Sequence, residues 1–152
     1  EEDRSYLSKS YMEDQIVALL GGRVAEKLVL GDVSTGASND IQRASQIAHK
    51  MVASYGMSEK LGTVCFDSGH DEVFIGRTMT QGRSYSEQVA AEIDEEVKAV
   101  VGAAYRRCES ILLENRDKLE AVAQYLLEHE TMDRKAFLAA FEDPAGEPEP
   151  AE

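Results

Sequence analysis

The distribution of proline is the feature that most constrains the fold of this chain. All three prolines lie at positions 144, 148 and 150, and none occurs earlier. Proline inside a helix costs about 3 kcal/mol, because it lacks an N–H donor and its ring clashes with the preceding turn. A long stretch without proline is typical of helical domains, and we therefore predict a mainly α fold.

Apolar residues recur at helical spacing in five segments. We expect the first helix to begin at a capping box, Ser10-x-x-Glu13, and to end at Gly31. The pair Gly21-Gly22 interrupts it at a cost of about 1 kcal/mol per glycine relative to Ala. We expect another backbone to pass close to the pair, with a tolerated kink as the alternative. The predicted helices cover residues 10–30, 38–55, 86–114, a segment around 119–127, and 133–141.

Two regions fall outside this helical pattern. The short β-like runs Thr63–Phe66 and Val73–Ile75 are separated by turn residues and predict a small β-hairpin or an irregular insertion. Residues 143–152 are acidic and rich in proline, which predicts a disordered tail. We therefore expect one helical domain over residues 1–142, followed by a tail over 143–152.

Composition excludes several classes of protein. The 152 residues carry 16 Lys plus Arg against 29 Asp plus Glu, a net charge of −13 that repels phosphate backbones and argues against nucleic-acid binding. No apolar run approaches the roughly 20 residues that a membrane-spanning helix needs. Cys65 and Cys108 are too few and too far apart for a disulfide framework, and we expect them to be reduced cysteines of a cytosolic protein.

The stretch Val33–Asp40 is the best candidate for chemistry, because it places Asp40 in the first turn of the second predicted helix. At about 100° per residue, Asp40 falls on the edge of the apolar stripe that contains Ala44, Ile47 and Met51. It is either a carboxylate that complements the helix N-terminus or a metal ligand. Asn39 or Ser38 could cap the helix instead, which weakens the first alternative.

The other candidate side chains favour ordinary structural roles. Glu26 lies on the outer side of the first helix, where a solvated or ion-paired role is expected, and Glu92–Glu96 reads as a solvated face. The histidines lie far apart at positions 49, 70 and 129, and none is paired at i, i+4. The chain is therefore not expected to build a complete metal site by itself.

Five ordered blocks of this sequence resemble a known family. Together they are similar to the peptidase domain of FtsH, a membrane-anchored, ATP-dependent zinc metalloprotease, over residues 3–141. The blocks are Leu20-Gly-Gly-Arg-Val-Ala-Glu26, Val33-Ser-Thr-Gly-Ala-Ser-Asn-Asp40, Tyr55-Gly-Met-Ser-Glu-Lys-Leu-Gly62, Glu72-Val-Phe-Ile-Gly-Arg77 and Ile93-Asp-Glu-Glu-Val97.

The resemblance implies a zinc site that this chain only partly supplies. In the family, two histidines of a His-Glu-x-x-His helix and a downstream aspartate hold Zn²⁺, and the glutamate is the general base. The aspartate matches Asp40, whereas the histidines and the base match nothing here and are expected upstream of Glu1. Asn39 or Ser38 is expected to hydrogen-bond to one of the upstream ligands.

The resemblance also implies the setting of the intact protein. We expect a homo-hexamer that unfolds and degrades membrane and misfolded cytosolic proteins, with ATP bound by an upstream ATPase module. Upstream segments would anchor it, and this domain would lie on the cytoplasmic side of the cell membrane. This chain alone is expected to be inactive. The alternative is a helical interaction or scaffold domain from a catalytically inactive relative.

Overall fold

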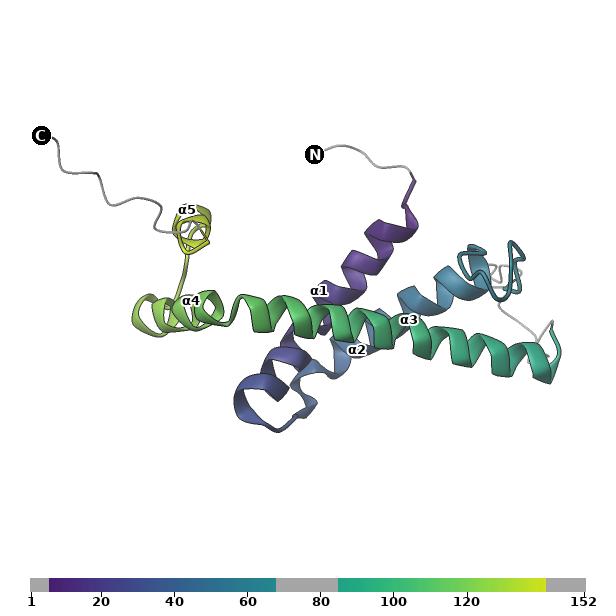
Figure 1. Ribbon diagram of the computed structural model, residues 1–152, viewed down its shortest axis with the longest axis horizontal. Helices are drawn as coiled ribbons and strands as arrows, with labels where there is room; N and C mark the ends of the chain where they lie inside the picture. The colour runs from purple at the N-terminus through teal and green to yellow at the C-terminus, as the bar shows by residue number, and fades with distance from the viewer. Residues whose placement is uncertain (1–5, 68–84, 142–152) are drawn as a thin grey trace, which may run out of the picture. The chain divides into compact units, whose positions relative to one another are not determined.

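The computed structural model describes residues 6–67 and 85–141 (Figure 1). Within these ranges the chain is helical and has no strand, which confirms the predicted mainly α fold. A 3₁₀ turn, η1 (Thr35–Ala37), precedes α2, and a π-helical turn, η2 (Lys50–Ser54), follows it. The α-helices are α1 (Lys9–Leu30), α2 (Ser38–His49), α3 (Glu87–Glu114), α4 (Arg116–His129) and α5 (Arg134–Ala139).

The described residues fall into two compact units, one that ends at Glu109 and one that begins at Ser110. The first unit contains α1, α2 and most of α3. The second contains α4 and α5. No helix in the described ranges is both long enough and apolar enough to cross a bilayer.

The two ends of α1 are set by different capping residues. Ser8 caps the N-terminus, and its hydroxyl accepts a hydrogen bond from the Tyr11 N–H at 3.2 Å. The predicted capping box at Ser10 is therefore wrong by two residues, because Ser10 already lies inside the helix. The C-terminal prediction is confirmed: Gly31 adopts φ +67°, and its N–H donates to the Lys27 carbonyl. That left-handed backbone is the conformation that glycine accepts without strain.

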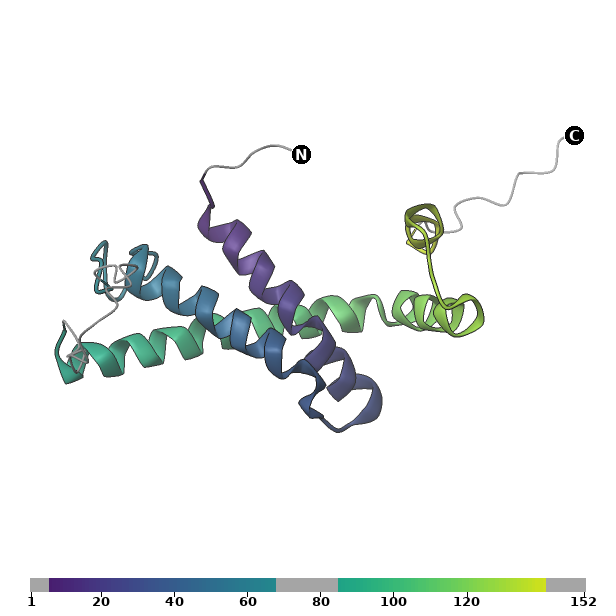
Figure 2. The same cartoon turned by 180° about the vertical axis from the view of Figure 1, so that it is seen from behind.

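Packing between α1 and α2 forms one half of the core of the first unit. The loop after α1 turns the chain back, so that α2 packs against α1 (Figures 1 and 2). The buried residues of α2 are Ala44 and Ala48, and such small side chains allow two helix backbones to approach closely. The buried residues of α1 are larger and recur at every fourth position: Met12, Ile16, Leu20 and Val24.

The other half of the core lies where η2 meets α3. The helix predicted over residues 38–55 is confirmed in extent, but its last turn is π-helical, with the Tyr55 N–H bonded to the Lys50 carbonyl at 2.9 Å. Val52 and Ala53 of this turn pack with Ile93 of α3. Tyr55, directly after this turn, is 53% exposed.

The segment after η2 is attached to α3 by polar contacts. The Ser58 hydroxyl donates to Glu96 at 2.6 Å, and Lys60 forms an ion pair with Glu95 at 2.8 Å. The Glu92–Glu96 run is therefore not only a solvated face. Residues 63–66 are irregular, as one of the two predicted alternatives had it, whereas Val73–Ile75 lies outside the described residues.

The two helices that lie wholly within the second unit, α4 and α5, contain no buried residue. Asp133 caps α5 by accepting a hydrogen bond from the Ala136 N–H at 2.7 Å. The Lys118 ammonium donates to the Phe141 carbonyl at 3.1 Å and lies over the Phe141 ring. Large apolar side chains such as Leu127, 80% exposed, remain at its surface.

The glycine pair in α1 has no close neighbour in the described part of the chain. A Cβ built at Gly21 or at Gly22 meets no atom within 4 Å. The expected backbone contact is therefore absent here. Gly56 is the opposite case, because its φ is +61° and a Cβ there would lie 3.0 Å from the Thr63 Cα.

We predict that the same substitution has opposite effects at these two sites. Gly22→Ala should raise the free energy of unfolding by up to about 1 kcal/mol, the difference in helix propensity between Gly and Ala. Gly56→Ala should lower it by at least about 1 kcal/mol, through left-handed strain and the contact with Thr63. Urea unfolding of the 152-residue chain measures both. A destabilising Gly22→Ala would show that another segment packs against this part of α1.

Candidate metal-ligand site at the start of α2

Asp40 is the third residue of α2 and is partly buried. It lies one helical turn before the fully buried Ala44, as the helical projection predicted. Within residues 6–67 and 85–141, its carboxylate has neither a hydrogen-bond nor an ion-pair partner among the protein groups. A carboxylate in this position receives about 0.3–1 kcal/mol from the helix N-terminus, and it keeps oxygens free to bind a cation.

The residues expected to cap α2 do not do so. Ala37 occupies the N-cap position and is buried, while Ser38 and Asn39 are exposed residues of the first helical turn. Neither Ser38 nor Asn39 makes a side-chain hydrogen bond within the described residues. Their predicted contact with an upstream ligand stays a prediction.

Ser34 performs the capping one turn earlier. Its hydroxyl accepts a hydrogen bond from the Gly36 N–H at 3.2 Å and so starts η1. The Ser38 N–H then donates to the Thr35 carbonyl, and η1 runs directly into α2. The position of Asp40 therefore depends on how the chain is held at Ser34.

Two side chains of α1 hold Ser34. The Arg23 guanidinium donates from Nη2 to the Ser34 carbonyl at 3.0 Å. Hydrogen bonds from the hydroxyl and the backbone N–H of Ser34 lower the pKa of Glu26 below its ordinary value, and Arg23 adds to the shift. The sequence placed Glu26 at the surface in a solvated or ion-paired role, and it gave no indication of the contact with Ser34.

Within the described residues, no histidine completes a metal site with Asp40. His49 Nδ1 lies 3.4 Å from an Asp67 oxygen, to which the Ser54 hydroxyl also donates. His129 stacks on Tyr125, and His70 lies outside the described residues. In the part of the chain that the structure describes, no group of three or more His, Cys, Asp or Glu side chains could hold a metal ion. These residues fit zinc only as the source of one ligand.

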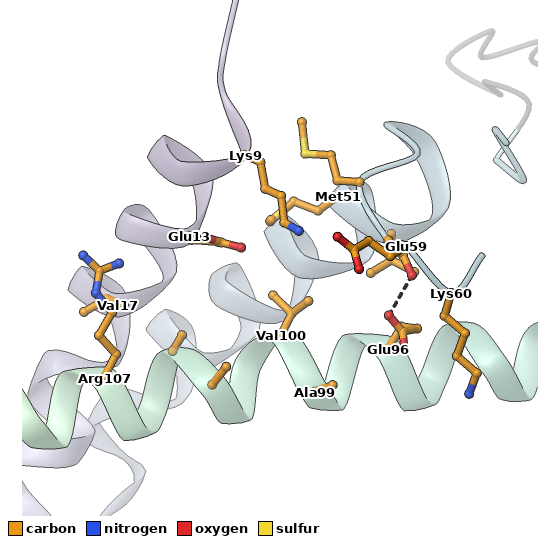
Figure 3. A pocket seen from close by; sticks show the side chains of 15 residues that line it. Lys9, Glu13, Val17, Met51, Glu59, Lys60, Glu96, Ala99, Val100 and Arg107 are labelled. Atoms are coloured by element: carbon orange, nitrogen blue, oxygen red, sulfur yellow. Dashed lines mark hydrogen bonds between the residues drawn. The ribbon is translucent and has the colours of Figure 1, made fainter. Parts of the chain in front are cut away.

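A groove of about 580 Å³ lies elsewhere on the first unit (Figure 3). Its apolar lining comes from α1, η2 and α3 and includes Val17, Met51 and Val100. Charged side chains surround the lining, and Figure 3 shows the hydrogen bond that ends on Glu96. Asp40 does not line this groove, so the groove and the candidate ligand are separate features.

Comparison with known proteins supports the resemblance seen in the sequence. Residues 1–139 match the model of Peptidase family M41. The chain is 57% identical over 141 residues to ATP-dependent zinc metalloprotease FtsH 1 of Thermoanaerobacter sp. (strain X514), covering 93% of this chain and 23% of that protein. It is 52% identical over 133 residues to ATP-dependent zinc metalloprotease FtsH of Bacillus subtilis (strain 168), covering 87% and 21%. The chain thus spans about a fifth of the length of these relatives.

The lowered pKa of Glu26 predicts a pH-dependent contribution to stability. A carboxyl group whose folded-state pKa is depressed stabilises the fold above its unfolded pKa, and this contribution is lost as the pH falls through the folded pKa. Glu26→Gln should therefore destabilise the chain at pH 7 and have little effect at pH 3. Urea unfolding of both proteins at the two pH values measures this difference. Equal destabilisation at both would mean that the Glu26 charge does not bind Ser34.

Proposed function

The chain belongs to peptidase family M41, and we propose that it contributes Asp40 as one protein ligand of the zinc site in an ATP-dependent metalloendopeptidase. The observation that carries this proposal is that Asp40 is a partly buried residue whose carboxylate has no partner among the described protein groups. Leaving such a group unpaired near an apolar face costs free energy, and a bound cation removes that cost. The segment around it, Thr35–Asp40, matches the family pattern.

In this proposal the chain supplies one of the three protein ligands of the zinc ion. Catalytic zinc sites use three protein ligands, and His and Asp are common among them. Asp40 supplies the anionic ligand, which lowers the net charge of the site and helps to retain the ion. Two histidines and a glutamate base come from a His-Glu-x-x-His helix outside this chain. Zinc held there supplies Lewis acidity and an activated water for peptide hydrolysis near neutral pH.

The proposal extends to the whole protein. The relatives are named as ATP-dependent zinc metalloproteases, and we extend protein substrates and ATP dependence to the protein that contains this chain. Assembly as a homo-hexamer and membrane attachment through other segments, with this domain on the cytoplasmic side, are parts of the same proposal. ATP is then bound by a module outside the 152 residues.

Asp40→Asn tests the proposed ligand in the intact protein. The change removes the anionic donor but keeps the size of the side chain, so zinc affinity should fall at least about tenfold and proteolysis should be lost. ATP hydrolysis should remain, because Asp40 does not belong to that module. Asp94→Asn, at an exposed position of α3, is the matched control. Wild-type zinc content in Asp40→Asn, measured by elemental analysis, would refute the ligand assignment.

The 152-residue chain alone gives a second test. One carboxylate does not make a zinc site, so the purified chain should contain no stoichiometric zinc and should not cleave an unfolded protein substrate. Asp40→Asn provides the background value for both measurements. A zinc-to-chain ratio near one that depends on Asp40 would contradict the proposal that the other zinc ligands lie outside this chain. If the intact protein also binds no zinc, the alternative of a helical interaction domain is favoured.

A further inference from the structure

We propose that Arg23 is a positioning residue for Asp40 that acts through the backbone of Ser34. This inference rests on the function proposed for Asp40. It goes beyond that function because it names a side chain on α1 that determines where the carboxylate lies. Arg23 itself has no hydrogen bond or ion pair with Asp40 in the described part of the chain.

A hydrogen bond from Arg23 joins α1 to the loop that precedes α2. Arg23 Nη2 donates to the Ser34 carbonyl at 3.0 Å, across eleven positions of sequence and the turn that begins at Gly31. A hydrogen bond from a charged donor is about twice as strong as one between neutral groups. The contact therefore fixes the loop relative to the helix before the chain enters α2.

Hydrogen-bonded turns connect Ser34 to the start of α2. The Gly36 N–H donates to the Ser34 hydroxyl, and the Ser38 N–H donates to the Thr35 carbonyl. Ala37, between these two bonds, is only 7% exposed and packs into the domain. The seven residues from Ser34 to Asp40 thus form successive hydrogen-bonded turns, and a shift at Ser34 is passed on to the first turn of α2.

Of the buried Nε and the Nη2 of Arg23, only Nη2 has a hydrogen-bond partner in the described part of the chain. An unpaired buried donor costs about 1–3 kcal/mol of stability, so the Nε–H group gives no advantage to arginine at this position. The advantage of arginine lies in the hydrogen bond from Nη2 to the Ser34 carbonyl. Lysine at this position would keep a donor for the carbonyl and would remove the unpaired Nε–H.

The experiment compares Arg23→Gln, Arg23→Lys and a control, Arg106→Gln, which removes the same charge from an exposed position of α3. Amide hydrogen exchange on the 152-residue chain measures how well the hydrogen bonds of the loop are held. We expect the Gly36 and Ser38 amides to exchange at least tenfold faster in Arg23→Gln, with partial recovery in Arg23→Lys and no change in Arg106→Gln. The amides of Ala44 and Ala48 should keep their wild-type rates.

Zinc affinity in the intact protein measures the effect of the Arg23 substitutions on the metal site. It should fall about tenfold in Arg23→Gln, the usual effect of removing a residue that orients a metal ligand, and should recover in Arg23→Lys. An affinity in Arg23→Gln equal to that in Arg106→Gln would overturn the positioning role. Faster exchange throughout α1 and α2 would also overturn it, because Arg23 would then only stabilise the fold. Unchanged zinc affinity in Asp40→Asn would instead refute the ligand assignment, and the positioning role with it, while the exchange data would still report the Arg23–Ser34 contact.

Discussion

The close packing of α1 against α2 is the contact on which the rest of the first unit depends. The two helices are in contact, and the buried residues of α2 are the small Ala44 and Ala48, which allow the two backbones to come close. This closeness puts the C-terminal end of α1 within hydrogen-bond reach of the loop that precedes α2. Arg23 and Glu26 can then hold Ser34, and the start of α2 is fixed by side chains of its neighbour.

The helices were largely predictable from the sequence, because their spacing is a local property. An apolar residue at every third or fourth position identifies a helix, and Gly31 marks where α1 ends. The π-helical turn was not predictable, since its three consecutive buried residues look like the continuation of an apolar stripe. The attachment of Ser58 and Lys60 to α3 was missed too, because it joins residues more than thirty positions apart.

The candidate site, too, could be predicted from the sequence only in its local features. The place of Asp40 on the edge of the apolar face follows from helical geometry, whereas the proposal that it is a metal ligand rests on the family pattern. Its supports, Arg23 and Glu26, reach Ser34 across a turn whose path depends on the packing of two helices. No periodic pattern records such a contact. The capping serine was also misplaced, because a 3₁₀ turn lies between the cap and α2 and moves the cap to Ser34.

The π-helical turn η2 has a further consequence for how the chain is aligned. A π turn contains one residue more than the α-helical turn it replaces, and one residue corresponds to about 100° of rotation around a helix. The extra residue in Lys50–Ser54 therefore sets the direction in which the chain leaves the helix. Without it, the Gly56 turn would begin rotated away from α3, and Ser58 and Lys60 would no longer face Glu96 and Glu95. The π-helical turn therefore sets the rotation at which the chain leaves the α1–α2 pair and reaches α3.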